Sequence, residues 1–266
     1  MPDYEVAIVK YGNRATTRSD VYLNYQVYRT PDAPIEMDYF FWVVRSADQT
    51  VLVDTGFSGR GGRNRQRTTL IDPMEACARL GIDPASAPTI VVTHAHYDHV
   101  GNLARFPRST IVIAERELAF WSTQTSRQLQ FHHSVEDDEL AALRAAGDEG
   151  RVVTFTGQHQ VAPGIEVIEV GGHTPGQSVV RVETSDGAVL LASDSIHYYE
   201  EYERNMPFMS VANLVDMYRA FDLVRAMVDR GEVNHLVSGH DPDTLGRFSP
   251  AAGELRDLVA TIGRPA

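Results

Sequence analysis

The feature that most constrains the fold is a run of six residues, His94-Ala95-His96-Tyr97-Asp98-His99. The run directly follows residues 89–93, whose β-branched side chains predict a buried strand. Because residues i and i+2 of an extended segment point to the same side, His94 and His96 can bind one metal ion. Where the chain turns out of the strand, Asp98 and His99 can face a second ion. We therefore expect a sheet that presents metal ligands at the end of a strand.

Two metal sites need more ligands than this run supplies. A catalytic site keeps one position open for water, and cations such as Zn²⁺ bind imidazole nitrogen together with some carboxylate oxygen. Three more candidates each follow a predicted strand, where loop side chains of a sheet converge: His173, Asp194 and His240. A carboxylate at Asp194 can bridge two ions, because each of its oxygens can bind one. The single cysteine, Cys77, rules out a cysteine-based zinc cluster and predicts only a small buried side chain.

The rest of the chain is expected to form the short strands and helices of an α/β protein. Apolar residues recur at helical spacing between residues 210 and 230, which indicates one amphipathic helix. Asp72, Pro73 and Glu75 supply the cap, the first-turn proline and the third-position glutamate of another helix. Strands are predicted at residues 39–44, 50–53, 89–93, 110–114, 151–155, 165–170, 177–183, 188–192 and 233–238, and helices at 73–80, 115–121, 135–146 and 210–230.

Length and composition limit the class of protein. The chain has 266 residues, of which 43% are apolar, so we expect residues 1–266 to form a single domain. There is no signal-peptide pattern and no apolar run long enough to span a membrane, so we expect a cytoplasmic protein without a membrane partner. A formal net charge of −12 disfavours a nucleic-acid partner and favours a small, neutral or modestly charged substrate. The helix near residues 211–228 could also mediate a homodimer.

The order of these motifs resembles the metallo-β-lactamase superfamily. It comprises the HxHxDH run, then Gly172-His173-Thr174-Pro175-Gly176, then an aspartate and a late Gly-His pair. The match covers nearly the whole chain, including Asp54-Thr55-Gly56. The resemblance implies a four-layer αββα sandwich with the metals at one edge of the two sheets. It also implies a first ion bound by His94, His96 and His173, a second bound by Asp98, His99 and His240, and Asp194 as the bridge.

Such a centre implies hydrolysis at an acyl carbon. Two cations that hold a bridging hydroxide lower its pKa and polarise a carbonyl oxygen. One ion can then stabilise the oxyanion and the other the leaving group, while Asp98 is placed to carry a proton. Zn²⁺ is expected, although Mn²⁺, Co²⁺ and Fe²⁺ accept the same ligands. Within the superfamily the chain is most similar to N-acyl homoserine lactonases, which implies a hydrolase that opens a lactone or a related cyclic ester.

One position departs from that lactonase group. Its members carry a tyrosine three residues after the bridging aspartate, where it contacts the substrate carbonyl, and this chain has His197, followed by Tyr198 and Tyr199. His197 can donate a hydrogen bond to an oxyanion, or it can be a structural histidine bonded within its own loop. Both interpretations stay open at this point. The departure also leaves the acyl homoserine substrate unassigned.

Three other functions compete with lactone hydrolysis. A thioesterase of the glyoxalase II type needs a cationic site, for which the arginines at positions 60, 63, 65 and 67 are candidates. A solvated, mobile loop is the simpler interpretation of that segment, residues 58–67. An iron-dependent redox enzyme can use the same ligands, and a metal-stabilised interaction protein would need no reaction at all.

Two smaller predictions concern the surroundings of the centre. Asp54 either accepts a ring N–H of a ligand histidine or caps the turn after its strand. A set of aromatic and methionine side chains either packs in the core, which is the simpler interpretation, or lines an apolar pocket over the metals. These side chains are Phe120, Trp121, Phe131, Tyr202, Met206, Phe208 and Met209, with His132 and His133 beside them and not expected as ligands.

Overall fold

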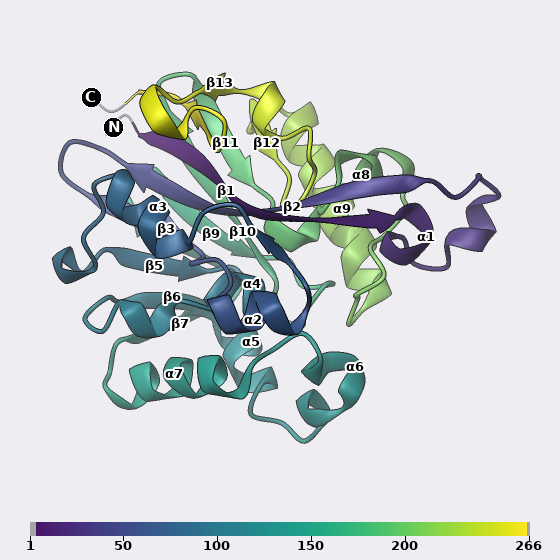
Figure 1. Ribbon diagram of the computed structural model, residues 1–266, viewed down its shortest axis with the longest axis horizontal. Coiled ribbons are helices and arrows are strands. Elements are labelled where there is room, and N and C mark those ends of the chain that lie inside the picture. Colours follow the sequence, from purple (N-terminus) through teal and green to yellow (C-terminus); the bar gives the residue numbers. More distant parts are fainter. Residues whose placement is uncertain (1–3, 265–266) are drawn as a thin grey trace.

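Two β-sheets pack face to face at the centre of the computed structural model, which describes residues 4–264 (Figure 1). Within these residues the larger sheet has nine strands, in the order β13-β14-β1-β2-β3-β5-β6-β7, with β4 paired to β1. The strands are β1 (Glu5–Thr17), β2 (Pro34–Arg45), β3 (Thr50–Val53), β4 (Thr68–Thr69), β5 (Thr89–Val92), β6 (Ile111–Ala114), β7 (Val152–Phe155), β13 (Ser249–Pro250) and β14 (Val259–Ile262).

The smaller sheet has five strands in the described part of the chain, in the order β12-β11-β10-β9-β8. β10 runs antiparallel to both β9 and β11, and β12 runs parallel to β11. The carboxyl ends of β9, β11 and β12 therefore lie at one edge of this sheet. The strands are β8 (Gln158–Ala162), β9 (Ile165–Glu169), β10 (Ser178–Thr184), β11 (Gly187–Leu191) and β12 (His235–Val237).

Helices cover both outer faces of the paired sheets (Figure 1). The helices α3 and α7 pack on the larger sheet, and α9 packs on the smaller one. The layers therefore follow the order αββα, as predicted. The helices are α1 (Arg18–Val21), α2 (Gly59–Asn64), α3 (Pro73–Arg79), α4 (Tyr97–Val100), α5 (Glu115–Phe120), α6 (Leu129–His132), α7 (Asp137–Asp148), α8 (Tyr199–Arg204) and α9 (Leu214–Asp229), and a short 3₁₀ turn spans Ser193–Ser195.

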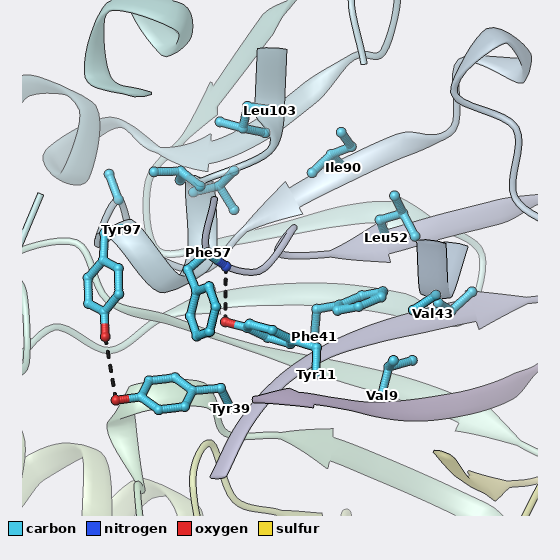
Figure 2. Close-up of a cluster of buried hydrophobic side chains, with 14 of the residues drawn as sticks. Val9, Tyr11, Tyr39, Phe41, Val43, Leu52, Phe57, Ile90, Tyr97 and Leu103 are labelled. Carbon is cyan, nitrogen blue, oxygen red and sulfur yellow. Dashed lines mark hydrogen bonds between the residues drawn. The ribbon is translucent and has the colours of Figure 1, made fainter. Parts of the chain in front are cut away.

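Alternation along β2 separates two apolar cores. Trp42 points between the sheets and packs in one buried cluster with Val180 of β10. Its neighbour Phe41 points to the opposite face and belongs to a second cluster with Cys77 of α3 and Leu143 of α7. Figure 2 shows Phe41 within this outer cluster. Because side chains alternate between the two faces of a strand, one strand can contribute to both cores.

The amphipathic helix α9 forms the third core with the outer face of the smaller sheet. Phe221 and Val224 are buried there against Leu190 of β11. The helix begins at Leu214 rather than at residue 210, because the side chain of Asn213 accepts hydrogen bonds from the first-turn N–H groups. Its outer side leaves apolar side chains exposed, and a homodimer through this helix stays a prediction.

The predicted strands and helices are confirmed to within a few residues, but several elements were not predicted, among them β8, β14 and α8. The longest strand of the described chain, β1, was also missed, because Gly12, Asn13 and Arg14 interrupt the apolar alternation. One prediction was wrong, that for the segment 58–67. It was expected to be a mobile loop, and it contains α2, capped by the Ser58 side chain. No helix in residues 4–264 is long and apolar enough to cross a membrane. That residues 1–266 form one domain stays a prediction.

Candidate metal centre

The HxHxDH run leaves the larger sheet at the end of β5. This strand lies between its parallel neighbours β3 and β6, so the residues that follow it emerge near the middle of the sheet edge. His96 is the N-cap residue of α4, and the helix turns Asp98 and His99 back toward the sheet end. All four predicted ligands of the run are buried, with relative exposures from 0% for His94 to 6% for Asp98.

The smaller sheet supplies the other three predicted ligands from its facing edge. His173 lies in the loop after β9, Asp194 in the 3₁₀ turn after β11, and His240 just after β12. The structure thus brings all seven predicted residues together. They form two groups in which the candidate ligand atoms lie within 4.8 Å of one another: His94, His96, His173 and Asp194 in the first, and Asp98, His99 and His240 in the second.

Asp194 lies between the two groups and turns one carboxylate oxygen toward each. Its Oδ2 atom is 3.2 Å from Nε2 of His173 and 3.7 Å from Nε2 of His94. Its Oδ1 atom is 3.2 Å from Nε2 of His99 and 3.1 Å from Nε2 of His240. A carboxylate in this position can bind one cation with each oxygen, as the sequence analysis predicts for a bridging residue.

The donor set fits two divalent cations. The Nε2 atoms of His94 and His99 are buried and have no hydrogen-bond partner among the described residues, an arrangement that is costly unless a cation takes that place. Burial lowers the pKa of His94 and of His96 well below the usual histidine value, and it lowers that of His173 to about 3. These three imidazoles are therefore neutral, with a lone pair free for a metal.

Behind His99, a buried carboxylate fixes the ring. Oδ2 of Asp54 lies 2.7 Å from Nδ1 of His99, and the two oxygens of Asp54 also accept hydrogen bonds from the N–H and the hydroxyl of Thr93. Asp54 thus contacts the ring of His99, a predicted ligand, and that it orients a metal ligand stays a prediction. Asp54 has φ 62° and Ser193, whose hydroxyl contacts Thr93, has φ 46°. Such values are unfavourable for residues other than glycine, so the backbone directly beneath the centre is strained.

Glu117 is a buried carboxylate that the sequence analysis missed. Its Oε1 accepts hydrogen bonds from the Ala95 N–H at 2.9 Å and from Nε1 of Trp121 at 2.8 Å. Its Oε2 accepts one from the Gly176 N–H at 3.0 Å. Burial raises its pKa, although these hydrogen bonds oppose the shift. One side chain of α5 therefore ties the His94–His96 loop of one sheet to the His173 loop of the other.

A cavity of about 350 Å³ opens onto both ligand groups. Asp98 and Asp194 lie in its wall. Several aromatic residues for which a core position was the simpler prediction also line it. Trp121 and Phe208 are buried in the outer core and border the cavity as well, whereas Tyr202 and Met206 do not line it. The apolar part of the wall includes Phe120, Trp121, Phe131, Phe208 and Met209.

Comparison with known proteins decides the family. The family model described as the metallo-beta-lactamase superfamily matches residues 38–227, which include six of the seven predicted ligands. The chain belongs to the metallo-beta-lactamase superfamily. His240, the seventh residue, lies outside the matched range and joins the centre through the fold.

Among the superfamily's members, several similar proteins are lactonases. The N-acyl homoserine lactonase AttM of Azorhizobium caulinodans is 27% identical over 191 residues, and the match covers 65% of this chain and 65% of that protein, less than two thirds of its length. An N-acyl homoserine lactone hydrolase solved with N-hexanoyl-L-homoserine at its catalytic metal centre has a TM-score of 0.74 and 19% identity, covering 91% of this chain and 95% of that one. AidC, a dizinc quorum-quenching lactonase, has a TM-score of 0.71 and 16% identity, covering 100% and 96%.

His197 lies beneath the metallo-beta-lactamase centre rather than in the cavity wall. Its Nε2 is 3.1 Å from Oδ2 of Asp194, its Nδ1 is 3.3 Å from Oε2 of Glu201, and its ring stacks on Phe208. The side chain is fully buried. Burial alone would lower its pKa, but the carboxylates of Glu201 and Asp194 outweigh burial and raise the pKa to about 9. This geometry favours the structural interpretation of His197 over hydrogen bonding to substrate.

Proposed function

We propose that this chain is a dinuclear metal-dependent hydrolase that opens a lactone or a related cyclic ester. The observation that carries the proposal is the position of Asp194, with one oxygen facing each of two histidine groups at the base of a partly apolar cavity. Lactonases among the similar proteins support the choice of reaction. Both the substrate class, a lactone or related cyclic ester, and the identity of the metal belong to this proposal.

In this proposal the seven residues hold two divalent cations, with Zn²⁺ as the first choice. Bound cations of this kind lower the pKa of water and polarise a carbonyl oxygen. On the first site, His94, His96 and His173, whose pKa values are lowered by burial, offer neutral nitrogen, and Asp194 adds the shared carboxylate. The dizinc description of AidC supports zinc, while Mn²⁺, Co²⁺ and Fe²⁺ suit the same donors.

Two carboxylates, Asp98 and Asp194, have different roles in this proposal. Asp98 belongs to the second ligand group and also lies in the cavity wall, so it is the residue that can move a proton between that group and a substrate. Nε2 of His197 lies 3.1 Å from Oδ2 of Asp194, and Glu201 accepts a hydrogen bond from the His197 backbone N–H at 2.9 Å. We therefore propose His197 as a positioning residue for the bridge. The aromatic wall excludes water and accommodates the apolar part of the substrate.

The alternative functions receive less support. The similar curated proteins are lactonases, which disfavours a thioesterase and an iron-dependent redox enzyme. A protein that used the metals only for stability would not need a cavity that opens onto the ligand groups. A thioester nevertheless belongs in the substrate panel, because its acyl carbon reacts by the same chemistry.

The test measures metal content and ring opening on one preparation. Purified protein is analysed for metal per chain, assayed with N-butanoyl- and N-hexanoyl-homoserine lactone and with a glutathione thioester, then chelated, reassayed and reloaded with Zn²⁺. We expect two metal ions per chain and lactone hydrolysis that chelation abolishes and zinc restores. A single iron per chain, or a reloaded protein that hydrolyses only the thioester or nothing, would overturn the proposal.

A further inference from the structure

Two arginines lie in the wall of the cavity that opens onto the ligand groups, Arg14 and Arg67. The antiparallel pairing of β1 with β4 joins Gly12 to Thr69 and Asn13 to Thr68, and Arg14 and Arg67 are the next residues beyond the Asn13–Thr68 pair. Two like charges that line one cavity repel each other unless an anion lies between them.

Most of the hydrogen-bonding capacity of these two arginines is unused. Arg67 donates from Nε to the Tyr97 hydroxyl at 3.0 Å and from Nη1 to the Arg65 carbonyl at 2.7 Å. Arg14 donates from Nε to Sδ of Met37 at 3.3 Å. Within residues 4–264, Nη2 of Arg67 and both terminal nitrogens of Arg14 donate to no protein atom. Neither guanidinium forms an ion pair with a carboxylate in that part of the chain, although the protein has 36 acidic and 24 basic residues.

Their neighbour Arg65 shows the contrast. It pairs with Glu136 at 2.5 Å and donates to the carbonyls of His133 and Val135 at 2.6 and 3.0 Å. Arg65 therefore holds the segment before α7 in place, and its charge is balanced. Arg14 and Arg67 have no such carboxylate partner within residues 4–264, and both line the cavity.

The arginine pair lies close to the metal centre. The Arg67 guanidinium is 5.8 Å from the centroid of the Tyr39 ring. The same Tyr39 ring lies 5.1 Å, centroid to centroid, from the ring of His240. The Tyr97 hydroxyl, which accepts from Arg67, contacts the Tyr39 hydroxyl, as Figure 2 shows. One aromatic ring thus separates the pair from a predicted ligand. Asp98, the nearby acidic residue of the cavity wall, is placed in the metal group and makes no ion pair with either arginine.

We propose that Arg14 and Arg67 form a subsite for a carboxylate on the substrate, a few bonds from the lactone or ester that the metal centre opens. This inference rests on the proposed hydrolase function. Guanidinium groups match the two oxygens of a carboxylate, and a carboxylate between them removes the repulsion of the pair. The apolar part of the wall, with Phe120, Trp121 and Phe131, accommodates the apolar part of the substrate. The substrate class is therefore a small acidic lactone or cyclic ester, the charged end of the neutral or modestly charged range that the net charge favours.

The experiment uses the metal-loaded enzyme and matched lactones that differ by one carboxylate. The pairs are N-butanoyl- with N-succinyl-homoserine lactone, and N-hexanoyl- with N-adipoyl-homoserine lactone. We expect kcat/KM to be higher for the carboxylated member of a pair, chiefly through a lower KM, and the advantage to shrink as salt is added. Arg14→Gln and Arg67→Gln should each lower kcat/KM for the carboxylated member by roughly 10–100-fold, and at least about tenfold more than for the neutral member.

Two further variants keep the test decisive. Arg63→Gln is the matched control, because Arg63 lies in α2, four positions before Arg67, is exposed and lies outside the cavity. Arg67→Lys keeps the charge and should recover part of the carboxylate preference, which separates charge from folding. Equal kcat/KM for both members of each pair would overturn the inference and leave the hydrolase proposal standing. A metal-loaded enzyme that opens none of the four lactones would overturn both.

Discussion

The two sheet edges that meet at the metal centre are held in place by different kinds of contact. On the larger sheet, buried carboxylates do this: Asp54 fixes His99, Glu117 fixes the His94–His96 loop, and Glu139 accepts from the Ser58 cap of α2 at 2.7 Å. On the smaller sheet, main-chain carbonyls take that place for the two histidines, whereas Asp194 lies against His197, which contacts Glu201. Nδ1 of His173 lies 2.7 Å from the Ser210 carbonyl, and Nδ1 of His240 lies 2.6 Å from the Asp38 carbonyl.

The difference predicts how each edge responds to change. A carboxylate support depends on charge, so exchange for an amide of the same shape should disturb it. A carbonyl support cannot be removed by substituting a side chain, and that edge depends instead on close backbone contacts at glycines. The larger-sheet edge should therefore respond to isosteric and pH changes, and the smaller-sheet edge to added volume.

The largest effect is expected from volume at the smaller-sheet edge. A Cβ at Gly172 would lie 2.7 Å from Cα of Met217 in α9, and Gly172 has φ +97°. Gly172→Ala should lower the free energy of unfolding by about 3–5 kcal/mol, since a backbone contact must open and the conformation is strained. Gly231→Ala is the control: its φ is +70° but nothing lies within 4 Å, so about 1–2 kcal/mol is expected. Chemical denaturation measures both, and equal losses would contradict the close-contact argument.

An amide at Glu117 should break the larger-sheet edge without changing its shape. Glu117→Gln keeps one acceptor oxygen but turns an NH₂ group toward either the Gly176 N–H or the donors on the other side, Ala95 and Trp121. A buried donor facing a donor costs about 2–3 kcal/mol in the free energy of unfolding. Glu115→Gln, an exposed change in the same helix, should be near neutral. A stable Glu117→Gln variant with normal metal content would show that the carboxylate is not the tie between the two sheets.

Asp54→Asn should weaken one ligand group more than the other. The amide would present N–H to Nδ1 of His99, which already donates there, so His99 loses its fixed orientation. Affinity for the second metal ion should fall by roughly 10–100-fold, while the first ion is held nearly as before. Stepwise zinc titration by calorimetry measures the two sites, with the exposed Asp48→Asn as the control. Equal weakening of both sites would mean that Asp54 supports the whole edge.

The same contrast explains what the sequence could predict. The seven candidate ligands were found because each follows a strand whose apolar pattern is readable locally, and chain order then brings them to one edge. The carboxylate supports differ in this respect. The sequence near Glu117 does not mark it as different from Glu115, two positions earlier in the same helix, because two of its three partners lie 22 and 59 residues away. Asp54 was found as an alternative only because it ends a strand.

The prediction for the segment 58–67 was wrong for a related reason. Its glycines and arginines indicate a mobile loop when considered alone, but Ser58 and Arg65 are bound by Glu139 and Glu136, 81 and 71 residues farther along the chain. Arg14 was missed because β1 was missed, so the arginine pair of the cavity was invisible before the strands were paired. Contacts between residues far apart in the sequence, rather than local propensity, determine the structure of the segment 58–67 and of β1.

The smallest effect expected is a pH dependence confined to the carboxylate-held edge. Burial raises the pKa of Glu139 from 4.5 to about 7, so between these values the folded protein keeps a proton that the unfolded chain releases. The free energy of unfolding contributed by this group is therefore highest below pH 4.5 and falls as the pH rises toward 7. Glu139→Gln removes this titration, and the stability of the variant relative to the wild type should rise by about 1–2 kcal/mol from pH 5 to pH 8. Glu203→Gln, an exposed change, should show no such trend in thermal unfolding. If the stabilities of the wild type and of Glu139→Gln changed with pH in parallel, Glu139 would not be the group whose titration alters stability.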